Sequence, residues 1–272
     1  MNYRHAYHAG NFADCHKHAI LVWLLAAMAR KPARFFVLDT HAGAGWTALG
    51  DGPAARTGEW RRGIARLLDT DPPALADYLG LVRRLGLYPG SPMLARELLR
   101  PGDRLAACEL HPEDATALRR RFAGDPAVAI HHRDGYEALR ALLPPPERRA
   151  LVLIDPPYEA ADEAERVVAG LAAARARVAG GVIAAWYPIK HAAPVRALHT
   201  AVVAAGLRDV AAAELRLRAP DDPTRLNGSG VLLVNPPFRF EDELPPLQEA
   251  LLAALADGDA GQGAFLQRLS DE

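Results

Sequence analysis

The chain has little cysteine, no long apolar run and almost no net charge. Its two cysteines, Cys15 and Cys108, are too few for a disulfide framework or a set of thiolate metal ligands, so we expect a reducing, cytoplasmic environment. No apolar run reaches the roughly 18 residues of a membrane span. The apolar stretch from Ala19 to Ala29 is predicted to be a buried or amphipathic helix, not a secretory leader. A net charge of -1 gives no global basic field for nucleic acid.

Strand-like apolar runs alternate with helical stretches, which predicts an α/β fold with a doubly wound, mostly parallel sheet. Half of the 272 residues are hydrophobic, enough for a sizeable core. A helix is expected from Phe12 to Arg30, and another begins at Ser91-Pro92, with Ser91 as its N-cap. Strands are expected at 35–40, 104–109, 128–132, 151–154, 181–186, 210–218 and 230–235.

The stretch between the first two strands is unusually long. Glu109 follows Gly45 by 64 residues (109 − 45), whereas the acid of a dinucleotide fold follows its glycine loop by about 20. We therefore predict a helical insertion subdomain at 47–90, with helices near 58–68 and 74–86. Residues 1–46 and 91–272 would then form the Rossmann-like domain.

The most informative motif is Asp155-Pro156-Pro157-Tyr158, which directly follows the apolar run 151–154. The prolines stop the strand, so the acid is expected at the carboxyl end of the sheet, where open α/β folds place ligands. The Asp155 carboxylate and the Pro156 carbonyl can each accept an N–H from an exocyclic amine, and the Tyr158 ring can stack on its heterocycle. The motif resembles that of amino-methyltransferases, and the alternative is a plain strand followed by a proline turn.

Acids also follow the other early strands. The first strand leads into the loop 41–45, whose small residues, Gly43 among them, let the backbone approach a ligand. Glu109 ends the second strand and Asp134-Gly135 follows the third. Such carboxylates would repel the pyrophosphate of NAD, but they suit S-adenosylmethionine, which carries an amine and a sulfonium and no phosphate. The histidines lack acids or cysteines at ligand spacing, so no metal is expected.

A second motif, Asn235-Pro236-Pro237-Phe238, competes with the first because it also follows an apolar run. Chain order favours Asp155, because it comes after the glycine loop, after Glu109, which could hold ribose hydroxyls, and after Asp134, which could meet an adenine edge. We therefore expect a structural role for Asn235, and packing beside the site for Trp186-Tyr187-Pro188.

The chain resembles the RlmJ family of 23S ribosomal RNA adenine-N6 methyltransferases over nearly its whole length. The resemblance is carried by the following segments: Tyr3 to Asn11 with Ala13-Asp14 and Lys17-His18, Leu38 to Gly45, Arg56 to Glu59, Tyr88 to Pro92, Glu109 to Pro112, Asp134-Gly135, Leu153 to Tyr158, Trp186 to Pro188 and Asn235 to Pro237. The last thirty residues fit the family least clearly.

This resemblance implies a class I methyltransferase fold with a helical insertion, and S-adenosylmethionine as methyl donor. It implies donor contacts at His18, His41, Ser91, Glu109, Asp134, Gly135 and Asp155, with Asp155 as the catalytic acceptor and Tyr3 touching substrate. From the residues alone, His18 would be a core histidine and Ser91 only a cap.

Residues 1–34 carry five basic side chains against Asp14 alone, a charge of +4. Tyr3 beside His5 suits stacking on an unpaired base, and Lys17 is expected to contact an RNA phosphate. The 23S rRNA surface is therefore predicted on this segment together with the insertion. The alternatives are a DNA adenine methyltransferase, a catalytically idle RNA-binding assembly module and, more remotely, a nicotinamide dehydrogenase.

Overall fold

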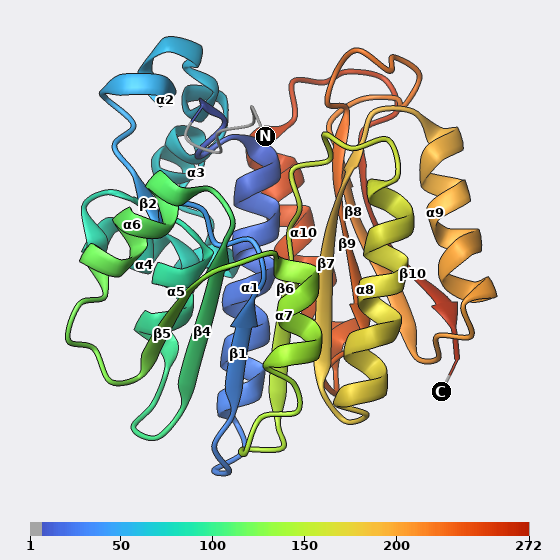
Figure 1. The fold of residues 1–272 in the computed structure, drawn as a ribbon. Coiled ribbons are helices and arrows are strands. Elements are labelled where there is room, and N and C mark those ends of the chain that lie inside the picture. Colours follow the sequence, from blue (N-terminus) through green and yellow to red (C-terminus); the bar gives the residue numbers. More distant parts are fainter. Residues whose placement is uncertain (1–6, 272) are drawn as a thin grey trace.

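The computed structural model of the chain describes residues 7–271 and has a central sheet between two layers of helices (Figure 1). The eight strands lie in the order β10-β8-β9-β7-β6-β1-β4-β5. The five strands from β7 to β5 in this order run parallel, and β9, β8 and β10 add antiparallel pairs. The predicted doubly wound, mostly parallel sheet is confirmed. Its strands are β1 (Phe36–Asp39), β4 (Arg104–Glu109), β5 (Val128–His132), β6 (Ala150–Ile154), β7 (Val182–Ile189), β8 (Val210–Arg216), β9 (Gly228–Val234) and β10 (Gly263–Ser270).

Alternating side chains of the central strands enter two separate cores, because successive residues of a strand point to opposite faces. Val37 of β1 packs in one core and its neighbours Phe36 and Leu38 pack in the other. Every residue of β6 is buried, as expected for a central strand covered on both faces. One face is covered by α1 (Phe12–Ala29), α5 (Ser91–Leu98), α6 (Pro112–Arg121) and α10 (Phe240–Leu255), and the other by α7 (Gly135–Ala141), α8 (Glu163–Arg177) and α9 (Ala192–Ala204).

Helix α1 is the central helix of its layer and matches the predicted span. The Asn11 side chain caps it by accepting the Asp14 N–H. Its length and composition would let it cross a membrane, and it is the one described helix that passes this test. However, 78% of that window is buried inside the fold, which is the behaviour of a core helix. Its amino end reaches the carboxyl edge of the parallel strands (Figure 1).

The segment between β1 and α5 is mostly helical and is closed by the short antiparallel pair β2 (Trp46–Thr47) and β3 (Tyr88–Pro89). Its large side chains, such as Tyr78, belong to the same core as α1 and α10. Gly63 lies so close to the N-terminal segment that an added Cβ would stand 2.0 Å from the Gly10 carbonyl oxygen. The division at 47 and 90 stays a prediction. The helices in this segment are α2 (Gly52–Thr57), α3 (Ile64–Thr70) and α4 (Ala76–Leu85), with 3-10 turns at Glu59–Arg62 and Pro73–Leu75.

Two details differ from the expectation. Ser91 is the first residue of α5, not its cap: Gly90 is the N-cap, and Ser91 is buried beside the end of β1. The chain end also adds α10 and the edge strand β10, which the sequence pattern did not predict. Helix α10 continues through Pro245-Pro246, residues that normally indicate a helix end.

Candidate active site

One cavity of about 850 Å³ opens at the carboxyl ends of the parallel strands. Strands β1, β4, β5 and β6 lie side by side in parallel, so the residues that follow them meet at one edge of the sheet. The cavity has the volume of a typical small-molecule site. Its wall includes almost all of the predicted site residues, namely Lys17, His18, His41, Gly43, Ser91, Glu109, Asp134, Gly135, Asp155, Pro156 and Tyr158. Tyr3 and His5 lie outside the described residues.

Glu109 and the glycine loop hold each other in place. The Gly43 N–H donates to Glu109 Oε2 at 2.8 Å, and the His111 N–H donates to Oε1 at 2.7 Å. Gly43 has φ of +60°, a conformation that glycine adopts without strain. Burial raises the pKa of Glu109 above its usual value, and the two backbone donors oppose that rise. The carboxylate is therefore fixed at the cavity wall, with its lone pairs only partly used.

Asp134 caps helix α7 while lining the cavity. Its Oδ1 accepts the backbone N–H of Tyr136 at 2.7 Å, and Arg166 donates to its Oδ2 at 3.3 Å. Gly135 is packed so tightly that an added Cβ would be 2.2 Å from the Thr40 carbonyl oxygen. The pair Asp134-Gly135 thus brings the end of β5 close to the end of β1, which narrows the site between them.

Asp155 lies at the end of β6 with the Lys17 ammonium against it. Lys17 Nζ is 2.5 Å from Asp155 Oδ2 and 3.0 Å from Asp14 Oδ1. The Lys17 and Asp14 side chains are almost completely buried. The expected contact of Lys17 with an RNA phosphate therefore does not fit this structure: two carboxylates engage the ammonium, and it lies too deep to meet a phosphate at the surface. Lys17 balances the charge of the predicted catalytic acid instead.

Tyr158 adopts an uncommon backbone conformation beside this pair. Its φ is +51°, which is rare for an aromatic residue. Its hydroxyl is buried and has no hydrogen-bond partner among residues 7–271, and burial raises its pKa. The ring meets Trp186 edge to face, with ring centres 5.7 Å apart. Trp186 is itself fixed, because its Nε1–H donates to Ser229 Oγ at 3.0 Å. The two rings form an aromatic wall next to Asp155.

Both predicted donor-site histidines line the cavity. His18 is buried, with Nδ1 3.0 Å from the Tyr88 hydroxyl, so it has the partner expected of a core histidine and also faces the site. His41 Nδ1 lies 2.7 Å from Thr40 Oγ1. Burial lowers the pKa of His41 to about 4, so its ring is neutral at pH 7. No group of described residues has three or more metal-ligating side chains placed to hold an ion.

The competing motif at Asn235 lies at the opposite end of the strands from the cavity. Strand β9 is antiparallel to β7, and Val234 pairs with Ile183 near the start of β7. Asn235 therefore falls at the amino ends of the parallel strands, away from the cavity. Its Nδ2–H donates to the Gly181 carbonyl at 3.1 Å and its backbone N–H to the Asp209 carbonyl at 2.8 Å. These contacts fit the structural role expected from chain order.

Asp39, the acid expected at the end of the first strand, is a buried carboxylate at this edge, and burial raises its pKa to about 7. Sequence reasoning gave no role in the site to three other groups. Asp14, used only as part of the family resemblance, is a buried carboxylate that pairs with Lys17. The loop 217–227 also reaches the cavity, and no motif in it indicates a role. Lys190 follows the end of β7 and lies on the same side.

Comparison with known proteins decides the family. The model of a family described as "Ribosomal RNA large subunit methyltransferase D, RlmJ" matches residues 32–265. The chain belongs to the RlmJ family. Over 266 residues it is 39% identical to Ribosomal RNA large subunit methyltransferase J of Escherichia coli (strain K12), covering 93% of this chain and 95% of that protein.

Two further matches agree. The protein of the same name from Haemophilus influenzae is 37% identical over 270 residues, covering 96% of each chain. A crystal structure of a protein from Legionella pneumophila matches with a TM-score of 0.87 and 31% identity, covering 96% of this chain and 98% of that one. The RlmJ-type fold, a class I methyltransferase sheet with helices on both faces, therefore extends over nearly the full length of the chain.

Proposed function

We propose that this protein transfers a methyl group from S-adenosylmethionine to N6 of an adenine in 23S ribosomal RNA. The single observation that carries the proposal is the position of Asp155-Pro156-Pro157-Tyr158. The motif lies at the carboxyl end of β6, in the cavity that also holds Glu109. Membership of the RlmJ family, whose curated relatives are named large-subunit rRNA methyltransferases, supports the choice of substrate.

The donor-binding residues are proposed on the β5-β4-β1 side of the cavity. There Glu109 would bind the ribose hydroxyls, Asp134-Gly135 the adenine edge, and the loop with His41 and Gly43 the rest of the donor, beside His18 and Ser91. The lining contains eight Asp and Glu against six Lys and Arg, a net charge of -2 that suits a donor with a sulfonium and an ammonium but no phosphate. When bound, the sulfonium supplies an activated methyl group.

The chain's own residues hold the acceptor amine. The Asp155 carboxylate and the Pro156 carbonyl are placed to accept the two N6–H groups, which would direct the nitrogen lone pair toward the methyl carbon. Lys17 engages Oδ2 of Asp155, and no described side chain engages Oδ1, so this oxygen can accept an N–H. As the N–C bond forms, one N6 proton passes to Asp155 directly or through water.

The target base must leave its stack to reach this position. A paired adenine inside a duplex cannot enter a cavity lined by Tyr158 and Trp186, so the adenine is unpaired or flipped.

No metal is required for the transfer. Because ribosomal RNA is made and modified in the cytoplasm, a cytoplasmic enzyme is proposed. Residues 47–90 are proposed as the insertion subdomain, and Tyr3 and His5 as substrate contacts.

The test is methylation by the purified protein of two substrates in separate reactions. One substrate is deproteinised 23S rRNA and the other is duplex DNA. Nucleosides from each reaction are separated by mass spectrometry. The proposal predicts N6-methyladenosine from the RNA and no methylated deoxyadenosine. The reverse result would make the protein a DNA methyltransferase. Binding to RNA with no S-adenosylmethionine binding and no methylation would indicate an idle assembly module.

A further inference from the structure

Six basic side chains line the cavity, and four of them are neutralised by carboxylates. Lys17 meets Asp14 and Asp155, as described above. Three arginines also have acidic partners: Arg62 with Asp257, Arg166 with Asp134 and Glu163, and Arg218 with Asp259 at 3.1 Å. The other two, Lys190 and Arg225, are exposed and form no ion pair within 4.0 Å with a described residue. The acid that interacts with Arg225 is Asp222, whose pKa is lowered by hydrogen bonds from Thr224 and in part by the charge of Arg225. Because neither cation is paired directly, both can still bind an external anion.

Lys190 and Arg225 lie on one ordered lip of the cavity. The buried Asn227 joins the two segments: its Nδ2–H donates to the Lys190 carbonyl at 2.7 Å, and its backbone N–H donates to the Ile189 carbonyl at 2.8 Å. Within the loop, the Thr224 hydroxyl and N–H both donate to Asp222. The backbone that carries the two cations is therefore held in place before any ligand arrives.

This lip is on the acceptor side of the cavity. Lys190 follows β7, which pairs directly with β6, the strand that presents Asp155. Glu109 ends β4, which is three strands from β7 in the sheet order, or about 14 Å at the usual strand spacing. The two unpaired cations are thus nearer to the methyl acceptor than to the proposed ribose site.

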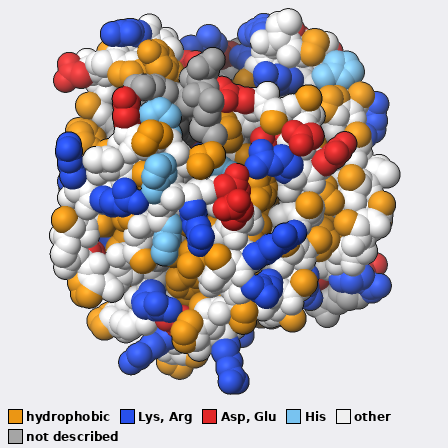
Figure 2. All heavy atoms as spheres, viewed as in Figure 1, with side chains coloured by type: hydrophobic (Ala, Val, Ile, Leu, Met, Phe, Trp, Pro, Cys, Tyr) orange, Lys and Arg blue, Asp and Glu red, His pale blue; other side chains and the backbone are white. Residues whose placement is uncertain are grey.

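The charge of the cavity lining also favours RNA phosphates at the rim of the cavity over its interior. The cavity lining has a net charge of -2, so its interior repels a phosphate. Figure 2 shows basic and acidic side chains interspersed over this face, and the described residues drawn there form no continuous basic area. On the face drawn there, an RNA strand that delivers an adenine to Asp155 therefore meets scattered cations and no continuous basic area.

We propose that Lys190 and Arg225 bind the phosphates of the RNA strand that flank the target adenine. The inference rests on the proposed function and extends it, because it adds a phosphate-binding lip, formed by residue 190 and the loop 217–227, to the substrate contacts proposed for Tyr3 and His5. Two cations on an ordered backbone, at the same cavity as the aromatic wall, would hold the strand while its base enters.

The experiment compares the variant Lys190→Gln/Arg225→Gln with the wild type. Filter binding of deproteinised 23S rRNA is measured from 50 to 300 mM salt, together with S-adenosylmethionine affinity and rRNA methylation. Lys31→Gln/Arg34→Gln is the matched control: it removes the same two charge types, but these exposed residues precede the amino end of β1, at the far end of α1.

We expect the lip variant to bind rRNA about tenfold more weakly near 0.15 M salt, with a salt slope lower by about 1.4, the value for two single-strand phosphates. KM for rRNA rises while kcat and donor affinity stay unchanged. Lys190→Arg/Arg225→Lys should restore binding, and the control should behave like the wild type.

Wild-type affinity and salt slope in the lip variant would overturn the inference, as would an equal loss in the control or a parallel loss of donor affinity. A wild-type protein that binds rRNA without methylating it would contradict the proposed function instead. The binding and salt-slope comparison would still decide the role of the lip.

Discussion

At the scale of single residues, the proposed donor site makes its clearest prediction at Glu109. Its carboxylate is fixed by two backbone N–H groups, and the residue is buried at the cavity wall. Glu109→Ala should weaken S-adenosylmethionine binding by about 1.5–3 kcal/mol, the range for hydrogen bonds to a charged group. This corresponds to an affinity loss of about 10- to 150-fold in titration calorimetry.

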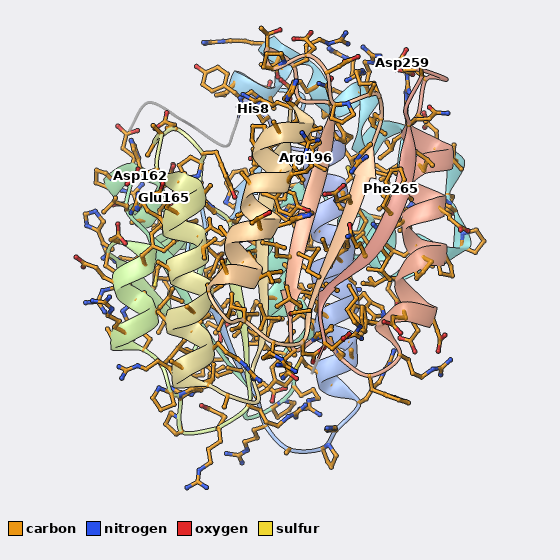
Figure 3. The ribbon with its side chains drawn as sticks, turned by 90° about the vertical axis from the view of Figure 1, so that its right-hand side faces the viewer. His8, Asp162, Glu165, Arg196, Asp259 and Phe265 are labelled. Carbon is orange, nitrogen blue, oxygen red and sulfur yellow. The ribbon has the colours of Figure 1, made fainter. Side chains whose placement is uncertain are left out.

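Glu165→Ala is the control for this measurement, because Glu165 is exposed on α8 and does not line the cavity (Figure 3). If Glu109→Ala binds S-adenosylmethionine as tightly as Glu165→Ala does, Glu109 is not part of the donor site. NAD should show no measurable binding to the wild type, since its pyrophosphate would face the carboxylates.

His16 makes stability depend on pH. It is fully buried, with Nδ1 2.9 Å from Ser229 Oγ, and burial lowers its pKa from 6.5 to about 3. A depressed pKa gives stability that is present above 6.5 and lost as pH falls, because the unfolded chain binds the proton first. Between pH 7 and pH 5 the wild type should therefore lose about 2 kcal/mol relative to His16→Gln in the free energy of unfolding.

Urea unfolding at both pH values measures this difference. His132→Gln, at an exposed histidine, is the control and should track the wild type. A His16→Gln difference that does not change with pH would show that His16 is not held neutral in the fold. Asp39 changes the free energy of unfolding in the opposite direction. Because its pKa is raised from 3.8 to about 7, its stabilising contribution is fully present below pH 3.8 and is lost as pH rises through about 7.

At the scale of elements, the insertion depends on one close approach to the N-terminal segment. The Ile64 N–H donates to the Gly10 carbonyl at 2.9 Å, and Gly63 leaves no room for a Cβ. Gly63→Ala should destabilise the protein by about 1–3 kcal/mol, the cost of overpacking. The measurement is the urea midpoint at pH 7.

Gly80→Ala is the matched control within the same insertion. Gly80 lies inside α4 with open space at its Cβ position. This substitution should stabilise by about 0.5–1 kcal/mol through helix propensity. A Gly63→Ala variant as stable as the wild type would mean that α3 is not held against the N-terminal segment as described.

The strands were predictable from sequence because central parallel strands are continuous apolar runs with abrupt ends. The predicted run 151–154 became β6 with one added residue, and Asp155 fell at its end. The end of the chain was not predictable in this way. The prolines inside α10 imitate a helix boundary, and β10 is an edge strand whose partner, β8, is far away in sequence.

At the scale of the whole molecule, the sequence showed which side chains are charged but not which are neutralised. The basic side chains of residues 7–34, the part of this segment that the structure describes, do not form one surface. Lys17 is buried between carboxylates, Arg30 pairs with Glu243, and Lys31 and Arg34 lie beyond the opposite end of α1 from the cavity. Pairing in three dimensions leaves Lys190 and Arg225 without a direct ion pair, and sequence spacing cannot reveal this because the acids that pair with the other cavity cations come from distant segments.

The most direct test of the central claim is single-turnover methylation of deproteinised 23S rRNA by the wild type, Asp155→Ala and Asn235→Ala. The wild type should form N6-methyladenosine, and Asp155→Ala should be slower by a factor of about 10² to 10⁴ or inactive, with an unchanged circular dichroism spectrum. Asn235→Ala, altered at the opposite edge of the sheet, should stay active. A folded Asp155→Ala protein with near-normal turnover, or an inactive Asn235→Ala beside an active Asp155→Ala, would contradict the account.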